Sequence, residues 1–365
     1  MRRFVLLLVA LFGAITLRAE HKEGSYVWHN PQNQTSCVVH GQGWSDQLRG
    51  KYWRLPERAE QSVRKSVWRL SKHSAGLHLR FKSDAEQIKV RYVPTFGEMS
   101  HFANTGVAGM DLYLRNSKGE WRYCEGRRSA IKSNDTVTFT FNIRTPELWR
   151  DDKSEFYLYL PLYAQTLWCE VGVAQGCDFE FVAKEDRKPV IAFGTSILQG
   201  GCASRPGMAW SNIVSRTLDV PILNFGFSGN GRFEPEVVTL IGELDAAMYI
   251  FACLPNMGKM SEEQIVSNIR EGVQHLRQQR NVPILFCEQY AGVAEAMNQN
   301  AQRNNRLLRE VYDRLRKSGV RDIYYLTAEQ LALPMEATVD GTHPTDYGMV
   351  LIADVISKKL RKILK

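Results

Sequence analysis

The sequence lacks a long hydrophobic run after its first 19 residues, and it lacks the residue spacing of common metal sites. A membrane-spanning helix needs about 20 consecutive apolar residues, and no later stretch approaches that length. Neither Cys-x-x-Cys nor His-x-x-x-His occurs, so no spacing indicates zinc. We therefore expect no transmembrane segment after that N-terminal stretch, and neither a metal nor another cofactor.

A strong excess of charge of one sign is also missing. The formal net charge is +8, and removal of residues 1–19 would take away Arg2, Arg3 and Arg18 and lower it to +5. Basic residues are mixed with acidic ones, as at Arg309-Glu310, which is typical of solvated helix faces. No part of this pattern indicates a nucleic-acid footprint, so we expect no nucleic-acid partner.

Cysteines are few and odd in number. Seven cysteines cannot all pair with one another, so in an oxidising compartment at least one stays free or pairs elsewhere. Cys253 and Cys287 lie in strand-like apolar runs and are expected to act as small buried hydrophobes. The spacing of Cys169 and Cys177 permits a pair across a hairpin but does not establish one.

Residues 1–19 have the composition of a secretory signal peptide. Arg2 and Arg3 precede the apolar stretch 4–15, and Ala19 follows as a small residue at the expected cleavage site. A signal anchor is the alternative interpretation. The pattern predicts a periplasmic or secreted protein.

The rest of the chain is long enough for two domains, because 365 residues exceed what one core usually holds. A polar run, 183–188, ends in Pro189 and has the composition of a linker. We predict an N-terminal domain over residues 20–188 and a C-terminal domain over residues 189–365.

The N-terminal part has the residue pattern of an all-β domain. Seven of the eight tryptophans precede Pro189, and strand-like runs occur at 88–93, 137–143 and 156–160. Short runs of this kind predict an antiparallel, jelly-roll-like β-sandwich. Exposed aromatic rings would indicate sugar stacking, whereas a core position is the preferred interpretation for most of them.

The C-terminal part alternates between strand-like and helical patterns, which predicts right-handed crossovers and a parallel sheet. Ser261 and Gln264 form a capping-box pattern before a helix, and Thr345 is the expected N-cap of the last helix, running to about 364. The expected strands cover residues 190–193, 221–225, 247–253, 283–287 and 322–326.

A serine, a histidine and a carboxylate in this α/β region fit nucleophilic catalysis. Ser196 follows the first strand, where a parallel sheet forms its sites. His343 precedes the last helix and can take a proton from a hydroxyl, and Asp340 can hold the imidazole in the required tautomer. His275 is the other histidine of this region, and it falls in mid-helix, away from the sheet edge.

Two further blocks can stabilise an oxyanion. The glycine-rich run 224–231 offers backbone N–H groups, and Asn256 offers a side-chain amide. Each block alone also has an ordinary interpretation, as a turn, a helix cap or a surface residue. Their order, together with the α/β pattern, favours catalysis.

The four blocks together resemble those of the SGNH (GDSL-like) hydrolase superfamily. The runs 194–207 and Gly109-Met-Asp-Leu-Tyr113 look like the two-domain, secreted bacterial type with an N-terminal GxDLY domain. The resemblance implies a flavodoxin-like, three-layer α/β hydrolase domain behind the β-sandwich. It also implies Ser196 as nucleophile, with an oxyanion hole made by the N–H groups of Ser196 and Gly229 and by the side chain of Asn256.

The sequence departs from the family pattern at two places. Thr195 stands where the family usually has Asp, and Leu254-Pro255 replaces the usual residues around the third block. Neither change removes an atom that the mechanism uses.

The predicted activity is ester hydrolysis by a Ser-His-Asp mechanism, with a carbohydrate O-acetyl ester as the favoured substrate. Arg205 and Arg232 are candidate contacts to a polar or acidic sugar, or else structural residues. The alternatives are a lipolytic or short-chain acyl-ester hydrolase and an inactive glycan-binding protein. Since all four blocks follow Pro189, the sequence also predicts that chemistry resides in the C-terminal domain and positioning of a large substrate in the N-terminal one.

Overall fold

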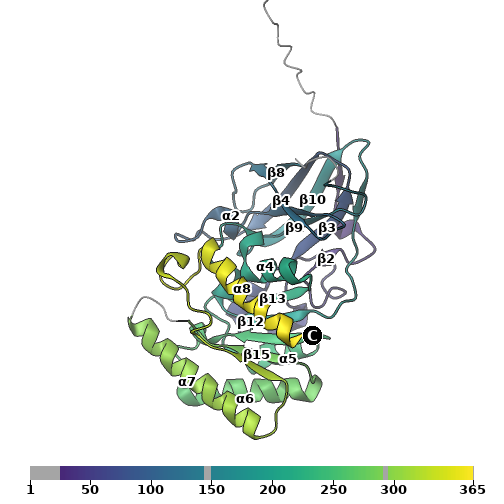
Figure 1. Cartoon of the computed structure of the whole chain (residues 1–365). Coiled ribbons are helices and arrows are strands. Elements are labelled where there is room, and N and C mark those ends of the chain that lie inside the picture. The colour runs from purple at the N-terminus through teal and green to yellow at the C-terminus, as the bar shows by residue number, and fades with distance from the viewer. Residues whose placement is uncertain (1–24, 144–148, 291–294, 365) are drawn as a thin grey trace, which may run out of the picture.

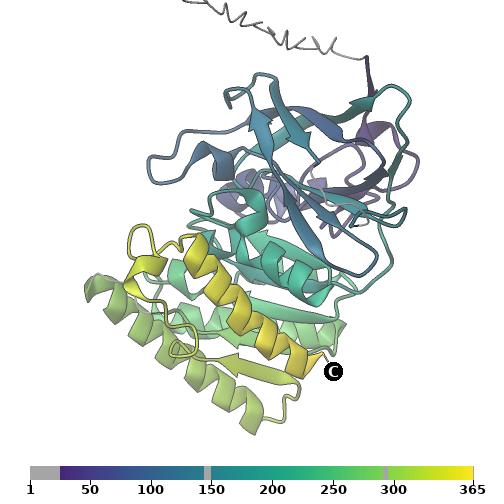
Figure 2. The same ribbon diagram turned by 45° about the horizontal axis from the view of Figure 1, so that its top comes forward.

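The computed structural model describes residues 25–143, 149–290 and 295–364. The predicted signal segment, residues 1–19, lies outside these ranges. A β-rich part and an α/β part are stacked along the long axis of the molecule, as Figures 1 and 2 show. None of the helices in the described ranges has the length and apolar content needed to cross a membrane.

The β-rich part is a sandwich of two antiparallel sheets, as predicted. One sheet has the order β1-β10-β4-β8-β7, and the other has the order β11-β3-β9-β5-β6, with β2 beside β3. The strands are β1 (Tyr26–His29), β2 (Val39–His40), β3 (His78–Ser83), β4 (Gln87–Thr95), β5 (Asp111–Arg115), β6 (Trp121–Cys124), β7 (Gly126–Arg128), β8 (Val137–Asn142), β9 (Glu155–Tyr159), β10 (Gln165–Ala174) and β11 (Phe179–Phe181).

The sandwich core follows from the alternation of side chains along each strand. In β4, Ile88, Val90 and Tyr92 are buried, and the residues between them are more exposed. Val90 pairs with Phe139 on β8 and with Val171 on β10, so apolar side chains from three strands meet on one face. These residues and the inner face of the second sheet form one hydrophobic cluster.

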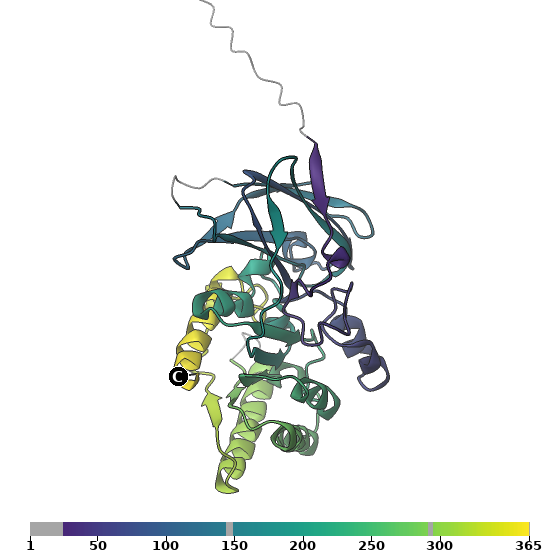
Figure 3. The ribbon, with the colours of Figure 1, turned by 90° about the vertical axis from the view of Figure 1, so that its right-hand side faces the viewer.

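The C-terminal part contains a parallel sheet with the order β13-β12-β14-β15-β16. Nearly every residue of these strands is buried, because helices cover both faces. This confirms the predicted three-layer α/β fold (Figure 3). The strands are β12 (Val190–Gly194), β13 (Ile222–Gly226), β14 (Met248–Ala252), β15 (Ile284–Cys287) and β16 (Ile323–Leu326).

Alternate residues of β12 show how the two helical layers form. Ile191 and Phe193 belong to the core with α5, α6 and α7, whereas Val190 and Ala192 belong to the core with α4 and α8. The helices of the α/β part are α3 (Ser196–Gln199), α4 (Trp210–Leu218), α5 (Pro235–Gly242), α6 (Glu262–Gln279), α7 (Glu295–Lys317) and α8 (Asp346–Ile363).

Helix starts follow the predicted capping residues. Ser261 and Gln264 form the full capping box of α6, and the Thr345 hydroxyl accepts a hydrogen bond from the Gly348 N–H at the start of α8. The remaining helical turns are α1 (Lys65–Ser71) and α2 (Asn104–Val107), and the 3-10 turns η1 (Pro31–Asn33), η2 (Glu57–Gln61), η3 (Pro206–Met208), η4 (Leu254–Asn256) and η5 (Met335–Ala337).

One segment of the N-terminal half packs mainly on the α/β part, although its Tyr52 belongs to the sandwich core. Residues 44–75, which carry η2 and α1 and are called the docked segment below, contribute Trp44, Leu55, Val67 and Trp68 to the core around Phe193 and Phe225. The indigo helix of this segment lies beside the lower part in Figure 3. These residues precede Pro189 and were predicted to belong to the sandwich domain, but they pack in the α/β core, so a boundary at Pro189 does not separate the two cores.

All seven cysteines are free. Cys253 and Cys287 are buried in the α/β core, as predicted. Cys169 is buried within the sandwich core, and it does not pair with Cys177.

Candidate active site

Ser196 lies at the point where β12 gives way to α3. Gly194 ends the strand, and Thr195 is the N-cap of α3, with its side chain accepting from the Ile197 N–H. The N–H of Ser196, as the first residue of the helix, has no partner within that helix. Ser196 is 7% exposed, so its hydroxyl sits in a largely water-excluded position at the carboxyl end of the sheet.

A chain of hydrogen bonds joins Ser196 to a histidine and a carboxylate. The Ser196 Oγ lies 2.8 Å from His343 Nε2, and His343 Nδ1 lies 2.7 Å from Asp340 Oδ2. The other oxygen of Asp340 accepts from the backbone N–H groups of His343 and Thr342. The three residues that the sequence analysis grouped are therefore brought together.

The ionisation of Asp340 follows from these contacts. Desolvation acts to raise the pKa of Asp340, but hydrogen bonds from the His343 backbone and ring and from the Thr342 N–H outweigh it and lower that pKa below its ordinary value. The carboxylate is thus held as an anion beside the imidazole. An anion in this position favours the tautomer that carries a proton on Nδ1 and a lone pair on Nε2.

The loop after β13, residues 227–231, lies beside the serine. Gly226 approaches α3 so closely that a Cβ there would lie 2.2 Å from the Gln199 backbone nitrogen. Gly229 adopts φ +67°, and no residue in the described ranges accepts a hydrogen bond from its N–H. We call residues 227–231 the oxyanion loop below.

Asn256 ends η4, just after β14, and it contacts the same loop. Its Oδ1 accepts a hydrogen bond of 3.2 Å from the Gly231 N–H. Because the oxygen is used in this way, the amide group of the side chain is turned with its NH₂ away from Gly231. Ser196, the oxyanion loop and Asn256 follow β12, β13 and β14, three neighbouring strands, so all of them meet at one sheet edge.

Two family models match the chain. Residues 187–361 match the GDSL-like Lipase/Acylhydrolase family, and residues 26–179 match GxDLY, the N-terminus of Esterase_SGNH_hydro-type proteins. The C-terminal domain is thus a GDSL-like lipase/acylhydrolase domain. The N-terminal domain is of the GxDLY type, as the family resemblance of the segment 109–113 predicted.

Two solved structures share the fold over both parts of the chain. A Bacteroides ovatus protein described as a GDSL-like lipase is 27% identical, with a TM-score of 0.82 over 93% of this chain and 98% of that one. The salicylyl-acyltransferase SsfX3 from a tetracycline biosynthetic pathway is 18% identical, with a TM-score of 0.72 over 92% of this chain and 97% of that one.

A family-two carbohydrate esterase from Cellvibrio japonicus is 9% identical, with a TM-score of 0.52 over 93% of this chain and 98% of that one. At such identities, SsfX3 and this esterase show a shared fold. No curated protein matches the chain.

The GxDLY motif joins the two domains of this GDSL-like protein. Asp111 is 2% exposed, and its Oδ2 accepts from Arg205 at 2.9 Å and from the Gly207 N–H at 2.8 Å. The Tyr113 hydroxyl also contacts Arg205, whose guanidinium stacks on Tyr123. A Cβ at Gly207 would lie 2.4 Å from the Tyr113 ring, so this contact requires glycine. The motif thus anchors the loop that follows α3.

Arg205 and Arg232, the two candidate substrate contacts, occupy different surroundings. Arg205 is engaged by Asp111 at the junction of the domains, which gives its side chain a structural task. Arg232 follows the oxyanion loop and donates to the Gly229 carbonyl oxygen at 3.4 Å, and its Nε has no hydrogen-bond partner among the described residues. Of the two, Arg232 is the one beside the loop that would face a substrate.

The docked segment donates hydrogen bonds to the end of β13 and to the oxyanion loop that follows it. Arg54 is 1% exposed and donates to the carbonyl oxygens of Asn224 and Gly226, as well as to two carbonyls of its own segment. Burial lowers the pKa of Arg54 to about 9, which leaves it cationic at neutral pH. Arg64 donates to both the side chain and the carbonyl of Asn230.

A second path runs from the docked segment through Gln199. His73 Nδ1 accepts from Gln199 Nε2 at 3.1 Å, and Gln199 Oε1 accepts from the Ser228 N–H at 3.0 Å. Burial, reinforced by the charges of Arg54 and Arg69, lowers the pKa of His73 to about 3, so its ring stays neutral and can accept. Sequence reasoning missed Arg54, Arg64 and His73 because they lie more than a hundred positions before the serine and match no motif.

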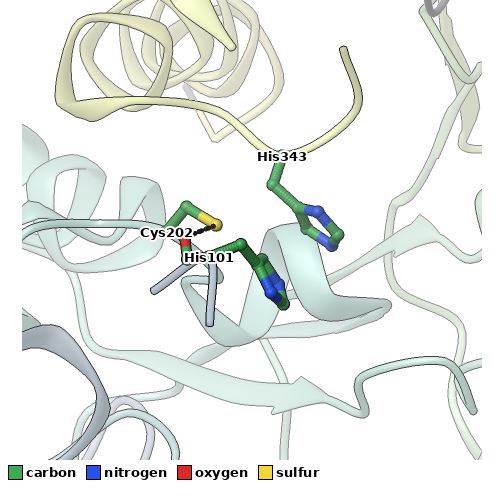
Figure 4. Close-up of side chains that lie close together, drawn as sticks. All are labelled: His101, Cys202 and His343. Atoms are coloured by element: carbon green, nitrogen blue, oxygen red, sulfur yellow. Dashed lines mark hydrogen bonds between the residues drawn. The ribbon is translucent and has the colours of Figure 1, made fainter. Parts of the chain in front are cut away.

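A histidine and a cysteine outside the predicted set also lie beside His343. His101, from the loop before α2, has its ring centre 5.6 Å from that of His343. Cys202, from the loop after α3, donates its thiol to the His101 carbonyl oxygen (Figure 4). The GxDLY domain therefore reaches the candidate active site directly.

Proposed function

We propose that this GDSL-like protein is an exported serine esterase with Ser196 as nucleophile. The observation that carries the proposal is the hydrogen-bonded chain from the Ser196 Oγ through His343 to Asp340, with links of 2.8 and 2.7 Å. A hydroxyl, an imidazole and a carboxylate in this order are the parts that acyl transfer needs.

The reaction proceeds in two halves. His343 Nε2 takes the Ser196 proton as Oγ attacks the ester carbonyl, and the C=O electron pair moves onto oxygen. The tetrahedral intermediate collapses, the C–O bond to the alcohol breaks, and His343 gives its proton to the leaving alkoxide. Water then attacks the acyl-enzyme with His343 as base, which releases the acid and restores Ser196. Asp340 stays ionised throughout and stabilises the imidazolium.

The developing oxyanion is assigned to three donors. The N–H groups of Ser196 and Gly229 and the Asn256 amide come from adjacent strand ends, so they can converge on one oxygen. Gly229 supports this role because no residue in the described ranges accepts from its N–H. A preorganised donor of this kind lowers the activation barrier by about 3–4 kcal/mol.

A carbohydrate O-acetyl ester is the substrate class that we propose. The shared fold of the Cellvibrio japonicus carbohydrate esterase supports it, and the expected export through residues 1–19 would bring the enzyme to polysaccharides. A short-chain or lipolytic acyl-ester hydrolase is the alternative, because the proposed chemistry of Ser196, His343 and Asp340 acts on a simple ester as well.

The test compares substrates on the full mature chain. We expect the wild type to release acetate faster from acetylated xylan or pectin than from p-nitrophenyl acetate. The Ser196→Ala variant should release none from any of them. Turnover of p-nitrophenyl octanoate above that of the acetate ester would support the lipolytic alternative. Failure to turn over any of these esters would leave a glycan-binding protein.

A further inference from the structure

We propose that His101, Cys202 and His343 form a zinc site through which Zn²⁺ reversibly blocks the esterase. The proposal concerns regulation of the same site and rests on the proposed function for its effect on activity. The binding itself does not depend on that function. Figure 4 shows the three side chains gathered around one space.

The first support is geometric. One ligand atom from each residue lies within 4.8 Å of the other two. Ligand atoms on one tetrahedral zinc lie about 3.3–3.6 Å apart, as bond lengths of about 2.0 Å to nitrogen and 2.3 Å to sulfur require. Rotations of the side chains that move these atoms by roughly 1 Å close the difference, and His101 is free to make one because it is exposed on a loop.

The donor set selects the kind of metal. Two imidazoles and one thiol are borderline-soft ligands that suit zinc, whereas calcium and magnesium require oxygen ligands. Three protein ligands leave the fourth tetrahedral position to water or to the Ser196 hydroxyl. On binding, the Cys202 thiol loses its proton to solvent and the sulfur electron pair forms the bond to zinc.

The second support is the position of Asp340. Metal-bound histidines usually donate their other ring N–H to a carboxylate, which fixes the ring and raises its basicity. His343 Nδ1 already has this contact with Asp340 at 2.7 Å, so Nε2 is presented as a metal ligand. The arrangement that prepares His343 as a base for Ser196 therefore also prepares it for zinc.

The third support is the backbone at Cys202. Cys202 has φ +69°, a conformation that non-glycine residues seldom adopt. It follows Gly200 and Gly201, and it is 9% exposed with its thiol directed to the carbonyl of His101. Residues whose backbone is held in such a conformation cluster at functional sites.

Zinc on Nε2 would remove the base that Ser196 needs. The nucleophile would then keep its proton, and ester hydrolysis would stop until a chelator withdraws the metal. The three ligands come from three loops, and His101 comes from the GxDLY domain, so bound zinc would also tie that domain to the hydrolase site.

The experiment measures zinc binding directly on the full chain without a histidine tag, by competition with a chromogenic chelator. Cobalt substitution gives a second readout, because a thiolate ligand produces a near-ultraviolet charge-transfer band. We expect one zinc per chain in the wild type and in Ser196→Ala, which binds metal even though it cannot turn over an ester. His101→Ala and Cys202→Ser should each weaken zinc binding at least tenfold. The cobalt charge-transfer band should be absent in Cys202→Ser, because that variant has lost the thiolate ligand.

Cys177→Ser is the matched control, since Cys177 is another thiol that is not fully buried and lies in the sandwich. It should bind zinc as the wild type does. Equal zinc affinity in the wild type, Cys202→Ser and His101→Ala would overturn the proposal, as would the absence of binding.

Activity separates this inference from the proposed function. Esterase activity that is unaffected by saturating zinc would overturn the regulatory claim. If the chain binds zinc through these residues but hydrolyses no ester, the proposed function fails and the metal site stands. Should Cys202→Ser not fold, His101→Ala alone decides, because His101 is exposed.

Discussion

Arg54, a residue of the N-terminal half, donates a hydrogen bond of 2.6 Å to the carbonyl oxygen of Gly226, from which the oxyanion loop departs. Arg64 of the same segment holds Asn230 farther along that loop. The N-terminal half thus fixes backbone on which the proposed chemistry depends. All the proposed catalytic residues follow Pro189, as predicted, and Arg54 and Arg64 add a positioning role for the N-terminal half.

Arg54→Met should reduce the free energy of unfolding by at least about 3 kcal/mol. The variant removes the guanidinium donor from four carbonyl oxygens, of which that of Leu70 keeps the His73 N–H, and an unpaired buried polar group costs about 1–3 kcal/mol. Urea denaturation measures the change. Arg58→Met is the control, because Arg58 belongs to the same segment but pairs with Glu243 at the surface, with 48% of its side chain exposed. An exposed pair contributes about 0–1 kcal/mol. Equal losses in both variants would contradict the role given to Arg54.

A fragment that begins at about residue 188 should aggregate or lose activity on small esters as well as on polysaccharides. Removal of the docked segment exposes the apolar surface that Trp44, Leu55 and Trp68 cover. The yield of soluble monomer and turnover of p-nitrophenyl acetate test this. A soluble fragment with full small-ester turnover would restore the original division of labour.

The sequence predicted the strands of the sheet, the caps at Ser261 and Thr345, and the grouping of Ser196 with His343 and Asp340. Those features are local patterns or members of ordered motifs, so a single sequence carries them. Arg54 and His101 act through contacts that arise when distant segments pack, and no periodicity or spacing records such contacts. The sequence likewise marked Asp111 as part of a family motif, but its task became visible with its partners Arg205 and Gly207.

Asn256→Ala should reduce kcat by about 10²–10³ with a smaller change in KM. The amide is assigned to the oxyanion, which carries its full charge in the transition state, so its loss affects turnover more than binding. Steady-state kinetics on p-nitrophenyl acetate measure both constants. Asn300→Ala, on the exposed surface of α7, is the control and should leave both unchanged. A rise in KM alone would identify Asn256 as a ground-state substrate contact.

The stability contributed by Asp340 should depend on pH. The pKa of this carboxyl is lowered on folding, although desolvation opposes the shift. Such a group stabilises the fold above the pKa of the unfolded chain, about 3.9, and loses that contribution as pH falls through the folded value. Wild type should therefore be more stable than Asp340→Asn near neutral pH, and the difference should shrink in acid. A difference in unfolding free energy that stays constant with pH would speak against the contacts described for Asp340.

The most direct measurement of the central claim is covalent labelling of the serine. A fluorophosphonate reacts with a hydroxyl that a base activates, and peptide mass spectrometry locates the adduct. We expect one label per wild-type chain on Ser196, and no label in Ser196→Ala or His343→Ala, because the two residues act as a unit. Ser267→Ala, on α6, should be labelled as the wild type is. An unlabelled wild-type chain, or a label that persists in Ser196→Ala, would contradict the assignment of Ser196 as the nucleophile.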